Sequence, residues 1–427
     1  MTTVIIGGGW SGLAAAVTLV QQGHSVHLVE SAKQLGGRAR NVSWQDKIID
    51  NGQHLMIGAY QHMLDMMALV GISADDAFDR YPMDITLYDT VFPPLTLSAK
   101  HWLPWPLSLA WKLIASAGLT GFYQLARLQS DSKRLLSNDD ITVSEWLHLN
   151  KQSDRLIQQL WIPLCLATLN TPITEASAHR LATVLRDSLG QGQSAADSLI
   201  PRVPLGDVFP NAAANYIKAH GGKISLQTRA KSLLIDDNKV QGILCQDGHT
   251  ISANNIIVAT SPGHSADLLS PYLSLTKPHE YPISTIYLCY PPPISLPSPM
   301  LGMTGSVSQW VFDRSSQTPG LVAVVISAPG EHEKLTNPEL VSLVSKELHG
   351  LLPTLPQQAQ ESLVIREKRA TFACTVNIEQ ERPPSTTNIN GLWLAGDFVA
   401  NGYPATLEGA IRNGKHCAER LLSNSLT

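Results

Sequence analysis

The first thirty residues of the chain constrain its fold more strongly than any other segment. Residues 3–6 are a short β-branched run that predicts a buried strand, and Gly7-Gly8-Gly9-Trp10-Ser11-Gly12 follows at once. Residues 13–22 are rich in alanine and favour a helix, and residues 25–29 alternate as a second strand that ends at Glu30. This order of strand, glycine turn, helix, strand and acid predicts a βαβ unit that binds a dinucleotide.

The residues of this turn suit a pyrophosphate group. Gly7 permits the tight turn, Gly9 lets the backbone approach the phosphates, and Gly12 lets helix and strand pack closely. Trp10 and Ser11 stand where the helix begins, and a helix N-terminus attracts negative charge, so we count both among the cofactor-binding residues. Glu30 is placed to accept hydrogen bonds from both ribose hydroxyls, which disfavours NADP.

A second match to the glycine pattern lacks this context. Residues 181–189, which precede Gly190-Gln191-Gly192-Gln193-Ser194-Ala195, predict a helix and contain no β-branched strand. We therefore interpret this second match as a flexible loop. The chain has no other credible fingerprint for a nicotinamide nucleotide, so we expect no NAD(P)H domain.

Composition excludes several classes of protein. The 427 residues carry a formal net charge of only −4, so there is no electrostatic reason to expect a nucleic-acid partner. Hydrophobic residues make up 44% of the chain, which excludes disorder, but charged residues make up only 15%. The longest uncharged runs, residues 156–174 and 281–312, suggest an apolar substrate cavity or, equally well, ordinary core.

Cysteine usage and hydropathy indicate a cytoplasmic protein. The five cysteines lie far apart, which excludes a disulfide scaffold and a zinc ribbon, and we predict no metal site. No leader precedes the glycine turn, and prolines interrupt both uncharged runs, so we expect neither secretion nor a transmembrane segment. Residues 101–114 are rich in tryptophan, which suits either peripheral contact with the inner face of a membrane or a helix packed between domains.

Directly after Glu30 comes Leu35-Gly36-Gly37-Arg38, which resembles the FAD-binding signature of glutathione-reductase-type flavoproteins, especially the amine oxidase and phytoene desaturase branch. The resemblance implies that Gly36 and Gly37 pass close to the pyrophosphate and that the Arg38 guanidinium donates hydrogen bonds there. The alternative interpretation is a glycine that ends a helix, followed by a surface arginine.

The end of the chain resembles the same branch. Residues 392–395 predict a buried strand, Gly396-Asp397 follows, and Gly402-Tyr403-Pro404-Ala405-Thr406-Leu407-Glu408-Gly409 opens the last helix. The resemblance implies that Asp397 bonds the ribityl chain or a phosphate, and that backbone N–H groups around Thr406, Leu407 and Glu408 reach the pyrimidine edge of the flavin. It also implies that Ala230 flanks the adenine. The cofactor expected is FAD.

The fold class expected is α/β, with a Rossmann-like FAD-binding domain interleaved with a mixed α+β substrate domain. Residues 222–240 and 241–259 read as a pair of short strands with a turn at residues 236–238, which would extend the FAD-binding domain. We assign residues 1–75, 206–274 and 386–427 to the FAD-binding domain. Residues 76–205 and 275–385 would form the substrate domain.

Further blocks resemble one subfamily along nearly the whole chain, from Val4 to Gly414. The blocks are Asp50–Tyr60, Trp161–Pro172, Leu185–Gly190, Gln309–Arg314, Arg366–Cys374 and Gly402–Gly409. Together they resemble the squalene-associated FAD-dependent desaturases, which are hydroxysqualene dehydroxylases of bacterial hopanoid and squalene synthesis. The resemblance implies an apolar C30 isoprenoid substrate, reductive loss of its allylic hydroxyl group, and an external electron donor.

Two residues are candidates for the proton donor that such a reaction needs. The resemblance places His54 near the isoalloxazine, and Asp187 could be a buried acid whose pKa is raised by desolvation. The alternatives are that His54 binds only flavin or backbone and that Asp187 only pairs with an arginine. For the whole protein, the other hypotheses are a carotenoid or phytoene-type desaturase, an amine oxidase, and a non-catalytic lipid-binding flavoprotein.

Overall fold

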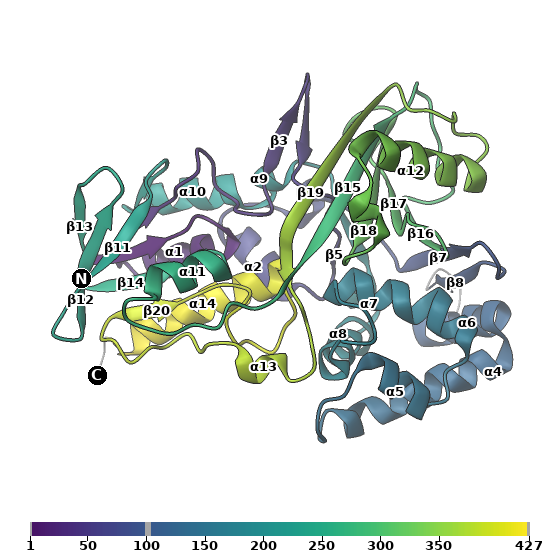
Figure 1. Ribbon diagram of the computed structural model, residues 1–427, viewed down its shortest axis with the longest axis horizontal. Helices are drawn as coiled ribbons and strands as arrows, with labels where there is room; N and C mark the ends of the chain where they lie inside the picture. The colour runs from purple at the N-terminus through teal and green to yellow at the C-terminus, as the bar shows by residue number, and fades with distance from the viewer. Residues whose placement is uncertain (1, 99–103, 425–427) are drawn as a thin grey trace.

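Five parallel strands form the sheet on which the predicted dinucleotide unit is built. The computed structural model describes residues 2–98 and 104–424. The strands run in the order β10 (Lys223–Ser225), β2 (Ser25–Val29), β1 (Thr2–Ile6), β14 (Asn255–Val258) and β20 (Leu392–Leu394). They come from widely separated parts of the chain, as the mixed colours in Figure 1 show. The expected α/β fold class is therefore confirmed.

Helix α1 (Trp10–Gln21) is buried along almost its whole length. It packs against both α10 (Pro210–Ala219) and α14 (Leu407–Asn424). Its Ala-rich sequence allows this close approach, since small side chains let neighbouring backbones come near. Because α14 is the last helix of the chain and α1 the first, this packing brings the two terminal motifs together.

We expected one pair of short strands between residues 222 and 259. The structure corrects this expectation, because the region forms five strands that belong to two different sheets. Strands β10 and β14 join the parallel sheet. Strands β11 (Ala230–Asp236), β12 (Lys239–Cys245) and β13 (Thr250–Ser252) form an antiparallel sheet of their own. The turn lies where it was predicted, with Asp237 and Asn238 at positive φ (45° and 54°), as tight hairpins require. Alternating exposure suits the small sheet, whereas three of the four residues of β14 are buried.

A second large sheet has seven strands. Their order is β19 (Glu361–Phe372), β15 (Glu280–Cys289), β18 (Leu321–Ser327), β17 (Trp310–Asp313), β16 (Met300–Thr304), β7 (Asp84–Asp89) and β8 (Leu95–Ser98). Its inner strand β18 is entirely buried, and α12 (Asn337–Leu351) packs on the sheet beside β19. The long β15–β19 pair reaches from this sheet back toward the parallel sheet (Figure 1).

A group of helices, here called the helical lobe, lies beside the seven-stranded sheet (Figure 1). It consists of α4 (Trp105–Leu135), α5 (Val143–Leu149), α6 (Asp154–Leu156), the π-helical turn η1 (Ile157–Trp161), α7 (Ile162–Leu169) and α8 (Ala178–Gly190). Gly118, with φ 74° and ψ 174°, interrupts α4. Of the aromatic stretch singled out in the sequence, residues 101–103 lie outside the described residues, and the remainder begins α4.

The second glycine match follows a helix, as predicted, but it is not a flexible loop. Gly190 ends α8, and Gln193–Ala196 form the 3₁₀ turn η2. The backbone N–H of Ala59 donates to the carbonyl of Ala195 at 2.9 Å, so this segment is packed against the chain near Gly58.

Shorter elements connect these units. They are β3 (Asn41–Trp44), β4 (Lys47–Asp50), β5 (Met56–Ile57), β6 (Phe78–Tyr81), β9 (Ser198–Pro201), α2 (Gln61–Leu69), α3 (Ala74–Ala77), α9 (Leu205–Val208), α11 (Pro262–Leu269), η3 (Glu331–Lys334) and α13 (Ile378–Glu381). All five cysteines are buried free thiols. Among the described residues, we find no helix with the length and apolar character needed to cross a bilayer.

Candidate functional site

The glycine turn lies where β1 ends and α1 begins. Gly7 has a φ of 112°, and a Cβ atom there would lie 2.6 Å from the carbonyl oxygen of Ala259, so only glycine fits. A Cβ atom on Gly12 would lie 2.0 Å from the carbonyl oxygen of Gly7. Gly9 precedes α1, which has neither a side-chain cap nor an acid in its first turn. Its first N–H groups therefore suit an anionic ligand.

The side chains of Trp10 and Ser11 differ in what they offer a ligand. The Trp10 indole donates to the carbonyl of Ala39 at 3.0 Å and packs against Phe209, so Trp10 offers a ligand only its backbone. The Ser11 hydroxyl is buried and has no hydrogen-bond partner in the described part of the chain. A buried hydroxyl without a partner is costly, so a ligand oxygen at the start of α1 would satisfy it.

A second pair of glycines lies against the first turn. The N–H of Gly36 donates to the carbonyl of Gly8 at 2.9 Å, and a Cβ atom on Gly37 would lie 3.2 Å from the Cα atom of Gly9. Both Gly36 and Gly37 have positive φ, and the residues just before them are not helical. The alternative of a helix-ending glycine is therefore wrong. The backbones of Gly7–Gly9 and Gly36–Gly37 together form a narrow groove without side chains, here called the glycine cradle.

Glu30 is held at the edge of this cradle. One carboxylate oxygen accepts from the N–H of Gly8 at 2.7 Å, and the other accepts from the N–H of Ala32 at 2.7 Å. The N–H of Thr228 donates to the Glu30 carbonyl at 2.8 Å, which brings the segment leading to Ala230, the first residue of β11, close to Glu30. The two residues predicted to bind opposite parts of an adenosine therefore belong to neighbouring segments.

Arg38 and Asp397 come from opposite ends of the chain and form an ion pair. An Arg38 Nη2 to Asp397 Oδ2 distance of 2.5 Å joins them, and Arg38 Nη1 donates to the carbonyl of Ala370 at 2.7 Å. Burial alone would lower the pKa of Arg38, but the charge of Asp397 raises it above the ordinary value. The nearby Glu280 has a buried carboxylate oxygen without a partner among the described residues, and burial raises the pKa of Glu280.

Helix α14 crosses α1 at close range. A Cβ atom on Gly414 would lie 2.1 Å from the carbonyl oxygen of Ser11, and the N–H of Gly396 donates to Asn413 Oδ1 at 2.9 Å. Leu407 is the first residue of α14, and the hydroxyl of Thr406 accepts from the N–H of Gly409 at 3.0 Å. The strand end at Gly396 and the start of α14 are thus held beside the glycine turn.

Glu408 directs its carboxylate away from this turn. Its oxygens accept from the N–H groups of His62 at 3.1 Å and Met63 at 2.9 Å, so Glu408 caps the N-terminus of α2. Burial raises the pKa of Glu408 to about 7. A contact between Glu408 and a cofactor would therefore use its backbone, as the resemblance implies.

The raised pKa of Glu408 predicts a pH dependence of stability. The native state binds this proton up to about pH 7, whereas the unfolded chain releases it near its ordinary pKa of 4.5, so this residue lowers stability as pH rises between the two values. Glu408→Gln replaces one of the two accepting oxygens with an NH2 group, which lowers overall stability, but it also removes the titration. Between pH 4.5 and pH 7 the free energy of unfolding of the wild type is therefore expected to fall by about 3 kcal/mol more than that of the variant. Denaturant unfolding at a series of pH values measures this difference.

Glu339 provides the control for that experiment. It caps α12 on the surface, and hydrogen bonds from Thr336 lower its pKa. Glu339→Gln should therefore act in the opposite direction, with a small loss of stability at neutral pH that disappears as pH falls. If the free energy of unfolding of Glu408→Gln falls with pH over this range as steeply as that of the wild type, the Glu408 carboxyl group does not carry the raised pKa.

His54 lies close to the Arg38 side of the site. Its Nδ1 is 2.8 Å from the carbonyl oxygen of Gly52. Burial lowers the pKa of His54, and the nearby charge of Arg38 lowers it further, so the imidazole is neutral at pH 7. A neutral imidazole orients or accepts more readily than it donates a proton.

Asp187 projects from α8 toward the segment that precedes α14. It accepts from Arg186 Nε at 2.8 Å and from the phenol of Tyr403. Burial and the charge of Asp187 raise the pKa of Tyr403, which keeps the phenol protonated. Arg180, also on α8, donates to the carbonyl of Gly402 at 2.5 Å. Tyr403 stood within the C-terminal motif, but nothing in the sequence indicated its bond to Asp187.

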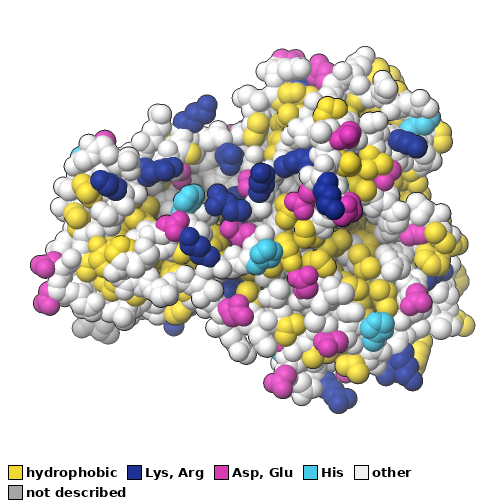
Figure 2. Space-filling model, in the orientation of Figure 1, with side chains coloured by type: hydrophobic (Ala, Val, Ile, Leu, Met, Phe, Trp, Pro, Cys, Tyr) yellow, Lys and Arg dark blue, Asp and Glu magenta, His cyan; other side chains and the backbone are white. Residues whose placement is uncertain are grey.

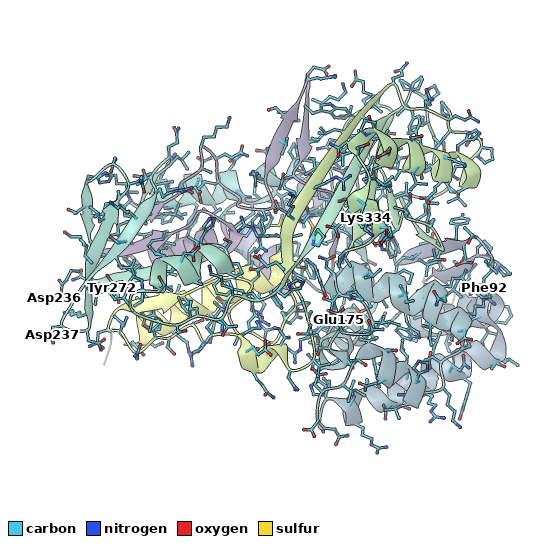
Figure 3. The ribbon with its side chains drawn as sticks, viewed as in Figure 1. Phe92, Glu175, Asp236, Asp237, Tyr272 and Lys334 are labelled. Carbon is cyan, nitrogen blue, oxygen red and sulfur yellow. The ribbon has the colours of Figure 1, made fainter. Side chains whose placement is uncertain are left out.

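An apolar groove of about 400 Å³ lies between α7 and the seven-stranded sheet, in the region between Glu175 and Lys334 in Figure 3. Figure 2 shows hydrophobic side chains gathered there. Its apolar lining includes Ile162, Leu166, Pro172, Ile173, Val307 and Ile326. Both long uncharged runs of the sequence contribute to this wall, which favours the cavity interpretation over ordinary core for these residues.

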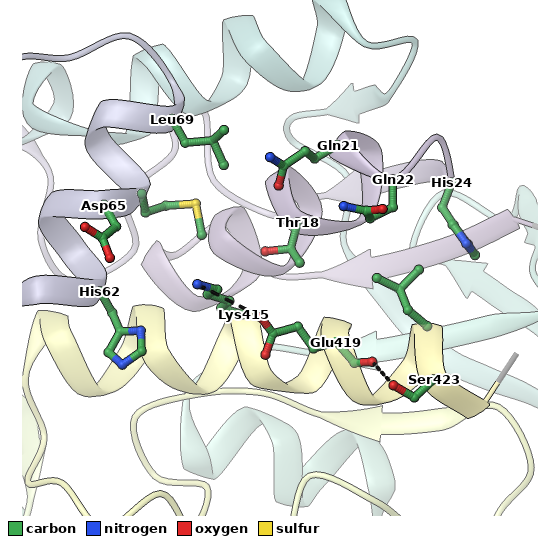
Figure 4. A pocket seen from close by; sticks show the side chains of 12 residues that line it. Thr18, Gln21, Gln22, His24, His62, Asp65, Leu69, Lys415, Glu419 and Ser423 are labelled. Carbon is green, nitrogen blue, oxygen red and sulfur yellow. Dashed lines mark hydrogen bonds and ion pairs between the residues drawn. The ribbon is translucent and has the colours of Figure 1, made fainter. Parts of the chain in front are cut away.

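A larger groove, about 800 Å³, lies between α1, α2 and α14 (Figure 4). Its walls include many polar side chains, among them Gln21, Asp65 and Lys415, and Lys415 approaches Glu419 at 4.0 Å. Such walls do not suit a hydrocarbon.

The hydrogen-bond donors of the glycine turn fit a dinucleotide. Uncapped N–H groups and a guanidinium suit a diphosphate, and the Glu30 carboxylate suits a ribose.

Comparisons with known proteins agree with this geometry. The profile of the family described as flavin containing amine oxidoreductase matches residues 10–422. A hydroxysqualene dehydroxylase of Zymomonas mobilis is 29% identical, over 99% of each chain. Another, from Rhodopseudomonas palustris, is 30% identical over 99% of this chain and 98% of its own. An oxidoreductase from Methanosarcina mazei has the same fold, with a TM-score of 0.77 at 18% identity, over 98% of this chain and 100% of its own.

Proposed function

Since the chain belongs to the flavin-containing amine oxidoreductase family and is an FAD-dependent oxidoreductase of the hydroxysqualene dehydroxylase type, we propose that it converts hydroxysqualene to squalene. The observation that carries this proposal is similarity over the full length to two proteins of that name. The groove beside α7 supports it, because a C30 hydrocarbon needs a mainly apolar wall; the lining of this groove also includes the acidic Glu331.

The proposed reaction balances as a two-electron reduction. When bound, reduced FAD would supply the hydride for the allylic carbon, while the C–O bond would break and the oxygen would leave, with a proton, as water. The chain must then exclude other water, because water would recapture an allylic cation. Each turnover requires two electrons from an external donor.

In this proposal, the residues of the glycine cradle hold the cofactor. The N–H groups at the start of α1 and the Ser11 hydroxyl bind the diphosphate, while Glu30 binds the ribose near Ala230. The Arg38–Asp397 pair lies at the joint between the parallel sheet and β19, so it holds the ribityl and phosphate region. The N–H groups of Thr406, Leu407 and Glu408 bind the flavin edge.

The protein supplies the departing oxygen with a proton. We propose Asp187 and His54 as the two candidates. Asp187 is buried and accepts hydrogen bonds from Arg186 and from Tyr403, which lies just before α14, so it must first take up a proton, from the Tyr403 phenol or from solvent, before it can donate one. His54 lies near Arg38, and its lowered pKa leaves little of the imidazole protonated at neutral pH, so His54 is the less favoured of the two candidates.

We also propose the domain division predicted from the sequence. Residues 1–75, 206–274 and 386–427 contain all five strands of the parallel sheet. Residues 76–205 and 275–385 contain the seven-stranded sheet and the helical lobe. The first unit would bind FAD and the second would bind the isoprenoid.

One anaerobic experiment tests the proposed activity. Photoreduced holoenzyme is mixed with hydroxysqualene, the product is identified by mass spectrometry, and flavin absorbance is followed. We expect squalene to form in proportion to flavin oxidised, and no reaction with squalene itself. Absence of squalene, or reduction of the oxidised enzyme by phytoene, would contradict the proposal and favour a desaturase.

A further inference from the structure

Exposed hydrophobic side chains gather on one helix. Nine large hydrophobic side chains are exposed in the described part of the chain, and four of them lie on α4. Leu107, Trp111, Leu119 and Tyr123 are 57%, 59%, 72% and 66% exposed. Such side chains normally occur singly on a surface, so their concentration on α4 indicates an interaction surface.

The four side chains, here called the stripe, form two exposed pairs on α4, one before and one after the kink at Gly118. Leu107 and Trp111 are one turn apart, as are Leu119 and Tyr123, with the non-helical Gly118 between the two pairs. The opposite face of the helix is buried through Leu113, Gly121, Leu128 and Leu135. The stripe is therefore an outward-facing apolar face of a helix that is firmly packed on its inner side.

The loop between β7 and β8 extends this surface. Val91 on that loop is 80% exposed, the highest value among the exposed large hydrophobic residues. The Ser116 hydroxyl of α4 donates to the carbonyl of Thr96 on β8 at 3.2 Å, and Arg155 donates to the carbonyl of Ser116 at 3.0 Å. Neighbouring Phe92 lies at the outer edge of the helical lobe (Figure 3). The loop and the helix thus form one supported surface.

The charged side chains of α4 are mostly cations. Between residues 104 and 126 the only charged side chain is Lys112. Farther along the helix are Arg127, Lys133 and Arg134, while Asp131, the one acid of α4, accepts from the side chains of Trp146 and Asn150. An apolar stripe with tryptophan and tyrosine, on a helix with four cations and one engaged acid, is complementary to an anionic bilayer surface. Asp89, the acid at the start of the neighbouring loop, is also engaged, since it accepts from the N–H groups of Val91 and Phe92.

We propose that the outer face of α4, together with the β7–β8 loop, inserts into the interface of a bilayer that contains anionic lipid. The stripe lies flat in the headgroup region, with Trp111 and Tyr123 at the boundary and Lys112 near the phosphates. This surface is separate from the cofactor-binding residues, and its binding to lipid requires no turnover. It would allow an apolar substrate to reach the protein without crossing water.

Vesicle binding by the holoenzyme tests this proposal. The vesicles contain either phosphatidylcholine alone or phosphatidylcholine with phosphatidylglycerol, and co-sedimentation measures the bound fraction. We expect binding to the anionic vesicles, weakened at high salt, and at least a ~10-fold lower partition coefficient for Trp111→Ser/Leu119→Ser. Ile48→Ser/Leu226→Ser removes two hydrophobic side chains exposed on β4 and beside β10, away from α4, and should bind as the wild type does.

A fluorescent probe reports which surface meets the lipid. Because all five native cysteines are buried, a cysteine introduced as Leu119→Cys can be labelled selectively, with Ile48→Cys on β4 as the control. Only the label at position 119 should shift to shorter wavelength on anionic vesicles. FAD content and thermal unfolding confirm that each variant is folded.

Three results would overturn the proposal. The first is that the wild type does not bind vesicles, and the second is that the two double variants lose vesicle binding equally. The third is that the protein forms a stable dimer and that Trp111→Ser/Leu119→Ser dissociates it. The last would mean that a second copy of the chain covers the stripe. If the protein binds vesicles but forms no squalene in the anaerobic assay, this result contradicts only the proposed function.

Discussion

Gly414→Ala is expected to destabilise the protein by about 3 kcal/mol and to release FAD. The added Cβ atom would lie 2.1 Å from the carbonyl oxygen of Ser11, and neither backbone can move without separating α14 from α1. That separation would displace the first turn of α1, where the diphosphate is proposed to bind. Denaturant unfolding and the ratio of flavin to protein after gel filtration measure the two effects.

Gly350→Ala is the matched control. Gly350 also lies in a helix, α12, but a Cβ atom there meets nothing within 4 Å. Alanine should therefore stabilise that helix by roughly 0.5–1 kcal/mol and leave FAD content unchanged. Similar behaviour of the two variants would mean that the contact between α1 and α14 is looser than described. Loss of stability with full FAD content would separate helix packing from cofactor binding.

Asp187→Asn is expected to slow squalene formation by about 100-fold or more if Asp187 delivers the proton, since general acids contribute roughly 10²–10⁴-fold. The amide keeps the size of the side chain and can still accept from the Tyr403 phenol, so FAD content should be unchanged. Single-turnover reaction of the reduced enzyme with hydroxysqualene measures the effect directly, without the electron-supply step.

Three further variants make this test decisive. Tyr403→Phe removes the phenol that bonds Asp187, and His54→Ala removes the second candidate. Asp267→Asn breaks an exposed ion pair with Lys277 and should leave the rate unchanged. Full turnover by both Asp187→Asn and His54→Ala would eliminate both candidates. A slow His54→Ala beside a fast Asp187→Asn would assign the proton transfer to His54.

Local pattern was enough to predict the first unit of the fold. The residues expected to form β1, α1 and β2 form them within a few positions, and the strand expected at residues 392–395 is β20. These elements could be predicted because β-branched runs, alanine-rich segments and glycines act through neighbouring residues. The region from 222 to 259 was harder, since the same short apolar strands serve either a parallel or an antiparallel sheet.

Contacts between distant residues could not be predicted in the same way. Arg38 and Asp397 are 359 residues apart, Met63 and Glu408 are 345 apart, and Asp187 and Tyr403 are 216 apart. The sequence suggested a role for Arg38, Asp397, Glu408 and Asp187, but none of their partners followed from spacing. Glu408, for example, was expected to contact the cofactor, whereas its carboxylate caps the N-terminus of α2.

The sequence by itself determined the βαβ unit, the FAD signature and the scarcity of charge, because each is a property of residue types and their order along the chain. Only the tertiary structure decided which motif meets which, that both uncharged runs line one groove, and that the apolar residues of α4 face outward. Those outcomes depend on how separated segments pack, and the free energy of packing comes from surfaces that become neighbours only when the chain folds.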